Sequence, residues 1–400
     1  MNNILNVTDE IQYDGSIIEF EWHTHLPYAN NSFNNSDEIR IPIHQQDTYT
    51  LPGESNLLIE GKILKADGND DTTTNLINNA MAFLFEEIRY EISGAEVDRV
   101  KNVVITSTMK NILTARPEDK NWMDNAGWNL KSLDNHTLTG SFSYCVPLKL
   151  LLGFAEDYKR LILNVKQELI LLRSSTDKNA LFQSAAALTA CKISITKIAW
   201  RIPYVKVEDE MKLSLLKITD SDRPVKLTFR RWQLHEHPSL PSSKSQTWTV
   251  KSSSMLEKPR YVVVGFQTAR KDDINKISCQ FDFCGLENIK LYLNSKYYPY
   301  DNLNGNKTLL YDQFTNFQSS YYAGSDNQPC LNKETFLQKI PLFVIDCSKQ
   351  VETLKTGSLD VRIEIQTSSD IPANTTAYCL IIHDALVQYT PLSGVVRKIL

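Results

Sequence analysis

The sequence lacks the features that mark a membrane protein, a disulfide-stabilised secreted protein or a strongly basic nucleic-acid-binding protein. Even its apolar residues 148–172 are interrupted by Lys, Glu, Asp and Arg, so no segment has the roughly 20 apolar residues that a membrane span needs. The seven cysteines are odd in number and include no CxxC pair, which favours reduced thiols. The first residues show no signal-peptide pattern. The net charge of −4 provides no global basic field.

Motifs for catalysis and nucleotide binding are missing as well. The sequence has no GxGxxG, GxxxxGK[ST], GxSxG or HExxH. Two H-x-H pairs are present, at residues 23–25 and 235–237, and two His at i and i+2 on a strand point to the same side, as a metal site requires. A cupin-type ligand set also needs a Glu three or four residues on and a later His, and no Glu follows either pair at that spacing, so the set is incomplete. We therefore predict no metal, no cofactor and no catalytic residue.

Three other polar features have simpler interpretations than a site. Residues 67–71 are acidic but lack EF-hand spacing, so we expect a solvated loop. Cys145 and Cys347 lie in apolar runs without an activating His nearby, which favours buried small side chains over nucleophiles. Glu168 and Glu364 each follow a basic residue by two positions, and we expect ion pairs there.

What the sequence does contain is an internal repeat. Residues 163–169 and 359–365 both read L-x-V-basic-x-E-aliphatic, 196 positions apart (359 − 163). Pro147 corresponds to Pro341 at 194 (341 − 147), and Gly61 to Gly265 at 204 (265 − 61). The matches keep the same order at a nearly constant offset, far beyond the period of a solenoid. This pattern indicates one domain duplicated in tandem.

Each half is predicted to be mostly strands. Ile18, Phe20 and Trp22 alternate with Glu and His, which predicts a strand with its apolar side in the core and its Glu/His side in water. Further strands are predicted at residues 56–64, 83–92, 141–153, 160–173, 193–204, 260–268, 285–293, 336–347, 359–367 and 376–389. Strands of this length with polar or Pro-containing connections are typical of antiparallel sandwiches.

One short helix is predicted in each half at the same place. Ile105, Met109 and Ile112 share a helical face, and so do Leu310, Phe314 and Phe317, all 205 positions later (310 − 105). The stripes place helices at residues 102–113 and 308–318. A sandwich with a helix between strands favours an all-β fold of two tandem jelly rolls. Immunoglobulin-like sandwiches are the alternative, although the Cys…Trp…Cys spacing is missing from both halves.

The domain boundaries follow from the repeat. We predict an N-terminal jelly roll at 1–206, a helical linker at 207–224, a C-terminal jelly roll at 225–392 and an extended tail at 393–400. The linker combines a helical stripe with polar residues before Pro224. Tyrosines concentrate in residues 291–301, a composition that is typical of protein interfaces, and plain core packing is the other interpretation. This segment and the tail are our candidates for contacts between subunits.

Several segments resemble those of one protein family. They are residues 256–261, 265–270, 291–300, 374–384 and 391–398, together with 82–85 leading into 88–94 in the first half. On these residues the chain is similar to double jelly-roll major capsid proteins of the Maverick/Polinton and adintovirus kind, found in insect and other animal virus-like elements. The resemblance extends over essentially the whole chain.

The resemblance implies an architectural, non-enzymatic function. Three chains with two rolls each would form a trimeric, pseudo-hexameric capsomer of an icosahedral DNA virus or virus-like element. The implied partners are two further copies, neighbouring capsomers, a penton or minor capsid protein and, at most non-specifically, the enclosed DNA; no membrane span is expected. The implied location is the virion capsid, assembled in host cytoplasm or nucleus. The alternative is a cytosolic β-sandwich that binds carbohydrate or acts as a cupin-like metalloenzyme.

Overall fold

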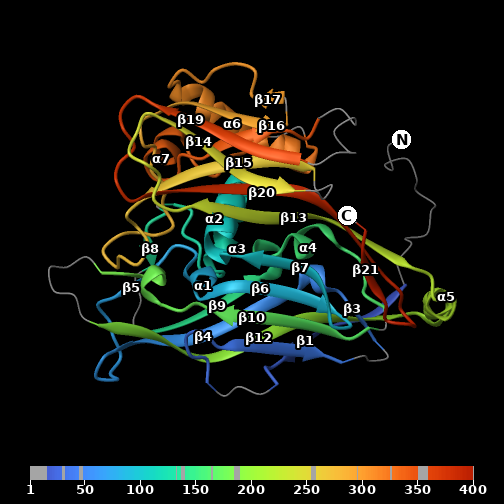
Figure 1. Ribbon diagram of the computed structural model, residues 1–400. Helices are drawn as coiled ribbons and strands as arrows, with labels where there is room; N and C mark the ends of the chain where they lie inside the picture. The colour runs from blue at the N-terminus through green and yellow to red at the C-terminus, as the bar shows by residue number, and fades with distance from the viewer. Residues whose placement is uncertain are drawn as a thin grey trace, which may run out of the picture.

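The structure is a computed structural model that describes residues 16–28, 32–44, 48–131, 133–136, 140–163, 165–183, 190–253, 258–294, 296–324, 327–349 and 359–399. Four main sheets lie in a stack, the lower two from the first half of the chain and the upper two from the second half (Figure 1). A small three-stranded sheet, in the order β11-β5-β8, lies at one end of the first half.

The strands of the first half are β1 Ile17–His25, β2 Glu38–Ile43, β3 Tyr49–Thr50, β4 Asn56–Lys65, β5 Asn75–Ile77, β6 Phe85–Ile92, β7 Ala95–Lys101, β8 Asn135–His136, β9 Ser141–Pro147, β10 Gln167–Arg173, β11 Leu181–Phe182 and β12 Cys191–Val207. Those of the second half are β13 Val225–His237, β14 Ser245–Ser253, β15 Pro259–Thr268, β16 Leu286–Leu293, β17 Lys296–Tyr298, β18 Phe343–Asp346, β19 Leu359–Thr367, β20 Thr375–Tyr389 and β21 Val396–Lys398. Every predicted strand region contains an observed strand.

The two halves have the same topology. The first half has sheets β1-β12-β4-β9 and β2-β10-β6-β7, and the second has β13-β20-β15-β18 and β14-β19-β16-β17. If the eight shared strands are numbered in chain order, both halves give 1-8-3-6 and 2-7-4-5. Gly61 in the third strand pairs with Ile195 in the eighth, and Gly265 pairs with Tyr378 in the same way. The predicted duplication and the jelly-roll fold class are confirmed.

The helices are α1 Ala80–Phe83, α2 Val103–Thr114, α3 Lys120–Asp124, α4 Gly153–Asp157, α5 Asp209–Asp220, α6 Lys307–Tyr322 and α7 Lys333–Lys339. Helices α2 and α6 confirm the two predicted helices, and their apolar stripes are buried. Two predicted strands are shorter than expected: 141–153 ends at Pro147 and continues through a 3-10 turn at Leu148–Leu150 into α4, and the start of 336–347 belongs to α7. The Asn332 side chain starts α7 by accepting a hydrogen bond from the Thr335 backbone N–H at 2.8 Å.

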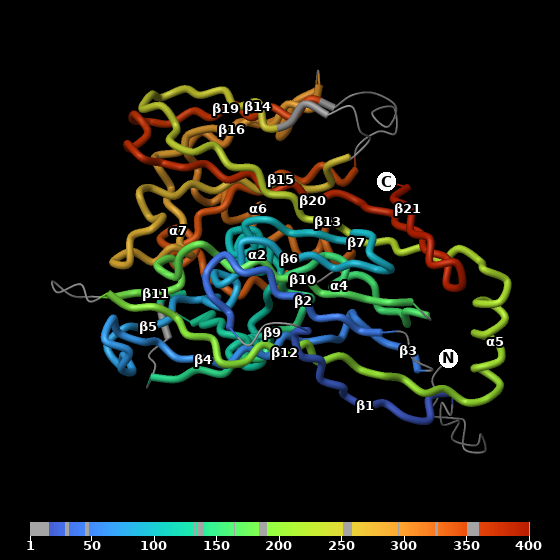
Figure 2. The backbone as a smooth tube through the Cα atoms, turned by 60° about the horizontal axis from the view of Figure 1, so that its bottom comes forward, coloured from blue at the N-terminus to red at the C-terminus, as the bar shows by residue number. Residues whose placement is uncertain are grey.

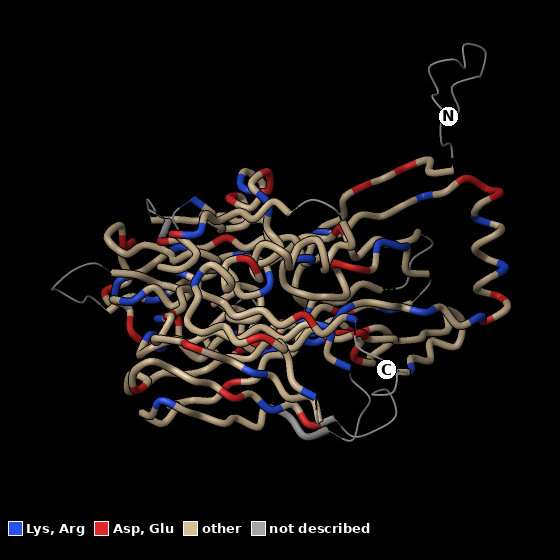
Figure 3. The backbone as a smooth tube through the Cα atoms, turned by 90° about the horizontal axis from the view of Figure 1, so that it is seen from above, with Lys and Arg blue, Asp and Glu red and all other residues tan. Residues whose placement is uncertain are grey.

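Helix α5 projects from one end of the molecule, close to the start of β1 and to β21 (Figure 2). Its Leu215 and Ile218 pack on a small apolar cluster that includes Val205 and Leu163. Along the part of the backbone that the structure describes, basic and acidic residues are interspersed (Figure 3). Within the described ranges, the helices are too short or too polar to cross a bilayer.

Part of the expected extended tail is a paired strand. Within residues 393–400, β21 pairs with β20, and the Ser393 backbone N–H donates to Asp222 at 3.1 Å. The Lys398 ammonium forms an ion pair with Glu96 of the first half, with an N–O distance of 2.7 Å. Residue 400 lies outside the described residues. The last strand therefore joins the two halves of one chain.

Candidate assembly surfaces

The first functional surface is the contact between the two halves, where β13 lies over β7 and α4 (Figure 1). Phe229 in β13 is buried, and its ring meets the ring of Phe154 in α4 edge-to-face at 5.5 Å. Arg231 donates to the carbonyl of Val97 at 2.5 Å and lies 3.5 Å from the carboxylate of Asp98. Burial raises the pKa of the Asp98 carboxyl, against the opposing effect of Arg231. Both apolar and charged contacts therefore hold the halves together.

Arg230 strengthens this contact from the neighbouring position. Its guanidinium makes two hydrogen bonds to the Asp157 carboxylate, from Nε at 2.9 Å and from Nη2 at 2.5 Å. It also lies over the Tyr321 ring, 3.5 Å from the centroid. Burial acts to lower the pKa of Arg230, but the hydrogen bond to Asp157 and the nearby charges of Tyr321, Asp157 and Glu156 together outweigh it, and the pKa is raised. The bidentate pair fixes α4 against β13.

A buried charge at the same contact connects three helices. Lys110 in α2 is only 2% exposed and its ammonium contacts the carboxylate of Glu156 in α4. The hydroxyls of Tyr321 and Tyr322 in α6 also donate to Glu156, at 2.7 and 3.0 Å. Burial lowers the pKa of Lys110, and the charge of Glu156 opposes that shift. Glu156 thus satisfies donors from both halves of the chain.

The second surface is the outer face of the β1-β12-β4-β9 sheet, at the free end of the stack. Ile18, Phe20 and Trp22 are exposed there. The His23 ring packs against Tyr204 at 4.2 Å on the core side of the sheet. The predicted alternation is confirmed, but the predicted orientation is wrong: the apolar side faces outward. The register is the reason, because β12 places its core residue Tyr204 beside the Glu/His side of β1.

The third surface is at the opposite end of the stack, on the β14-β19-β16-β17 sheet. Tyr297 and Tyr300 are exposed, and their rings stack with a centroid separation of 6.3 Å. The Lys290 ammonium donates to the carbonyls of residues 299–301 at 2.7, 2.8 and 3.1 Å, which fixes the turn that carries these rings. The aromatic residues Phe314 and Phe317 of α6 are core residues instead. The interface interpretation therefore applies to Tyr297 and Tyr300.

The sequence features considered for chemistry are dispersed in the structure. The described residues contain no group of three or more potential metal ligands. In the acidic loop, Asp67 and Asp71 accept hydrogen bonds from backbone N–H groups of nearby Asn69 and Thr73, at 3.0 and 2.7 Å. None of the seven cysteines, all of which lie in the described residues, forms a disulfide, and burial raises the pKa of Cys145. These carboxylates and this thiol have local structural roles.

The expected ion pairs of the two glutamates are confirmed in one case. In β19, Arg362 lies 3.8 Å from Glu364, which also accepts a hydrogen bond from the Tyr292 hydroxyl at 3.0 Å. In β10, the cation near Glu168 is Arg40 of β2, at 3.8 Å. The partner therefore comes from the adjacent strand in the first half and from the same strand in the second.

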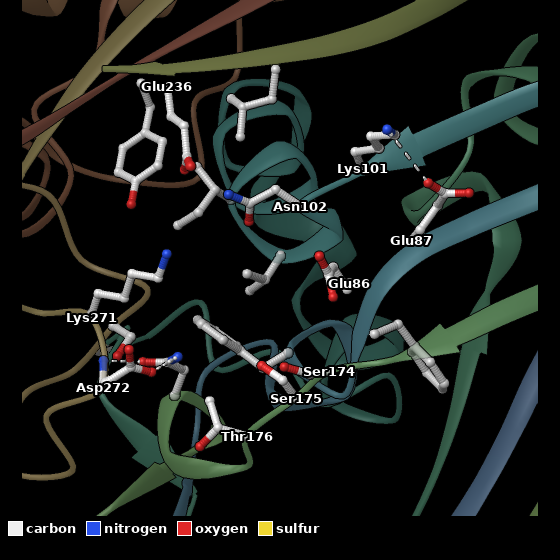
Figure 4. Close-up of a pocket in the computed structure, with 18 of the residues that line it drawn as sticks. Glu86, Glu87, Lys101, Asn102, Ser174, Ser175, Thr176, Glu236, Lys271 and Asp272 are labelled. Carbon is white, nitrogen blue, oxygen red and sulfur yellow. Dashed lines mark hydrogen bonds and ion pairs between the residues drawn. The ribbon is translucent and has the colours of Figure 1, made fainter. Parts of the chain in front are cut away.

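A cavity of about 470 Å³ lies between the two halves (Figure 4). The carboxylates of Glu86 in β6 and Glu236 in β13 and the ammonium of Lys271 in the loop after β15 point into it (Figure 4). Burial and the nearby charges of Glu236 and Asp272 place the pKa of Tyr378, which also lines the cavity, above its usual value. The charges are of both signs, and no nucleophile–base pair is formed by the lining residues that the structure describes.

We expect the purified protein to contain no stoichiometric zinc, iron or copper, because both H-x-H pairs lack the remaining ligands of a metal site. Elemental analysis of the full-length protein would check this. Stoichiometric metal that is lost in the His23→Ala or His25→Ala variant would contradict the prediction and favour the metalloenzyme alternative.

We expect stability to fall in mild acid through His25, whose Nε2 lies 3.1 Å from the Tyr204 hydroxyl. Burial lowers the pKa of His25 from 6.5, and the charges of His23 and His44 add to the shift. A group with a depressed pKa contributes stability above the unfolded value of 6.5 that is lost as pH falls through the folded value. Urea unfolding at about pH 8 and about pH 5.5 would measure the loss, and His25→Gln should reduce it. Identical pH dependences for both proteins would contradict this role.

Comparisons with known proteins agree on the fold. A chain of the Sputnik virophage matches with a TM-score of 0.64 at 8% identity, covering 100% of this chain and 92% of that chain. The mavirus major capsid protein gives 0.60 at 12% identity, covering 99% and 93%. The Faustovirus major capsid protein gives 0.57 at 9% identity, covering 95% and 92%. No curated protein gives a match.

At these identities the likeness shows the fold alone, and that fold is shared with viral major capsid proteins. The sequence profile described as "double jelly roll-like domain" matches residues 74–387, most of the chain. The matched range covers strands of both halves, from β5 in the small sheet of the first half to β20 in the second half. The chain therefore belongs to the double jelly roll-like domain family.

Proposed function

We propose that the protein is a structural major capsid protein that forms trimeric, pseudo-hexameric capsomers of an icosahedral DNA virus or virus-like element of the Maverick/Polinton–adintovirus kind. The observation that carries the proposal is the identical strand order of the two halves. Two equivalent rolls in one chain let three chains present six similar units around a threefold axis. Such a trimer fits the hexagonal positions of a lattice.

The proposal assigns a role to each part of the chain. Residues 1–206 and 225–392 are the two rolls, 207–224 is the linker that contains α5, and 393–400 is the terminal segment. The protein acts without catalysis, in contact with two further copies, neighbouring capsomers and a penton or minor capsid protein. It resides in the virion capsid and assembles in host cytoplasm or nucleus. The proximity of the terminal segment to Glu96 means that truncation at Ser393 tests chain stability as well as assembly.

Light scattering and electron microscopy would test this function. We expect a particle of about three times the chain mass of 45.7 kDa, and closed shells or sheets under some conditions of salt and pH. Images of the trimer should have a hexagonal outline, because six rolls surround its axis. A protein that stays monomeric across a wide range of salt and pH would refute the capsid function.

A further inference from the structure

Two residues of β13 at the contact between the two halves, Leu227 and Phe229, have structural equivalents on β1 of the first roll. The first residue pair between β1 and β12 is Ile17 with Val207, and the first pair between β13 and β20 is Val225 with Tyr389. Trp22 pairs with residue 203, four positions before the start (207 − 203), and Phe229 pairs with residue 385, also four before (389 − 385). By the same counting, Phe20 corresponds to Leu227. Phe20 and Trp22 therefore occupy the same places on the first strand of the first roll as Leu227 and Phe229 occupy on the first strand of the second roll.

These equivalents differ sharply in exposure. Leu227 and Phe229 are 0% and 4% exposed, whereas Phe20 and Trp22 are 48% and 43% exposed. Phe229 is covered by Phe154 of the preceding roll. Among the described residues, no further sheet lies on the equivalent face of the first roll, which forms the end of the stack (Figure 1). The sequence nevertheless places large apolar side chains at both positions, as a buried contact requires.

The other end of the stack supplies the complementary surface. In the first roll, the strand covered by β13 is β7, in which Glu96 pairs with Glu91 of β6. In the second roll, the corresponding strand is β17, in which Tyr297 pairs with Tyr292 of β16. Tyr297 is exposed and stacks on Tyr300. The position that Glu96 occupies at the internal contact is thus occupied by Tyr297 at this edge, and tyrosine is a residue suited to protein interfaces.

We propose that the outer face of β1, with Phe20 and Trp22, packs against the β17 edge, with Tyr297 and Tyr300, of a second copy of this chain. The inference rests on the proposed function and specifies its subunit contact. The contact is heterologous, because one copy contributes the first surface and the next copy the other. Such a contact closes into a ring when the rotation between copies permits, and it repeats between chains the stacking that joins the rolls within a chain.

Substitutions on the two faces test the contact in the full-length protein. Trp22→Asp and Tyr297→Asp should each weaken trimer formation at least about tenfold, since aromatic residues at interface centres often contribute that much. Thermal unfolding of the variant chains should change little, because both side chains are exposed. Trp122→Asp, at a similarly exposed position of α3, which belongs to neither end sheet, is the matched control and should leave the trimer intact.

A double variant, Trp22→Cys with Tyr297→Cys, provides a direct test. Under oxidation it should give reducible species of two and three chains on a denaturing gel, which the variants that carry only one of the two substitutions, and the wild type with its seven native cysteines, should not. A wild-type trimer that persists in both Asp variants and yields no such species would overturn this contact while leaving the capsid function intact. Loss of shells with intact trimers would also overturn it and assign the face to contacts between capsomers. A monomeric wild type would refute both proposals.

Discussion

Replacing Glu156 with alanine is expected to lower the free energy of unfolding by about 3–5 kcal/mol, because it leaves a buried ammonium without its counter-ion. Lys110 is buried in α2, so its ammonium would lose its carboxylate partner at a position that is only 2% exposed. The hydroxyls of Tyr321 and Tyr322 lose their acceptor at the same time. Urea unfolding followed by tryptophan fluorescence would measure the loss.

Two controls separate the buried pair from a general effect of removing charge. Glu54 pairs with Lys159 at 3.4 Å, but both side chains are about half exposed, so Glu54→Ala should cost less than about 1 kcal/mol. The double variant Lys110→Met with Glu156→Leu should be more stable than Glu156→Ala, since it removes the uncompensated charge. Equal losses for Glu156→Ala and Glu54→Ala would show that the buried pair does not hold the halves together.

The duplication was predictable from the sequence because its signals are local. Gly61 and Gly265 mark the third strand of each roll, where a β-carbon would overlap neighbouring atoms of the eighth strand or the core. The helical stripes of α2 and α6 are equally local, since each lies within two turns. Local signals of this kind can be read from the sequence without knowing which other segments pack against the strand or helix.

The orientation of β1 depends on tertiary structure and was not predictable. Alternation identifies two faces of a strand, but the side that meets the core is set by the register with the neighbouring strand. For β1 that neighbour brings Tyr204 to the His23 side. An apolar face that would be buried only in an assembly gives the same sequence pattern as a face buried in the chain. The exposed Trp22 is thus visible only once the fold is known.

The internal contact surface was also missed, for a related reason. Lys110, Glu156 and Arg230 lie in separate segments, and no spacing rule connects them. The capping residue Asn332, by contrast, was a usable signal for α7, because Asn before a helical segment commonly caps it. The apolar residues around Phe336 favoured a strand, since short apolar runs fit either structure.

Gly153→Ala is expected to destabilise the protein by about 1–3 kcal/mol or more, through overpacking between the two halves. Gly153 begins α4, and a β-carbon there would overlap the backbone carbonyl oxygen of Arg230 and lie 3.2 Å from the Trp232 indole nitrogen. A backbone carbonyl in a paired strand cannot move aside as a flexible side chain would, so α4 and β13 would have to separate.

The matched control for this substitution is Gly324→Ala, where a β-carbon would have no heavy atom within 4 Å. Chemical unfolding of both variants would compare them, and the control should differ from the wild type by no more than about 0.5 kcal/mol. Similar stabilities of the two variants would contradict the close approach of α4 to β13. If Gly153→Ala also weakens trimer formation, the rigid docking of the halves governs assembly, because both end faces of the stack depend on it for their relative position.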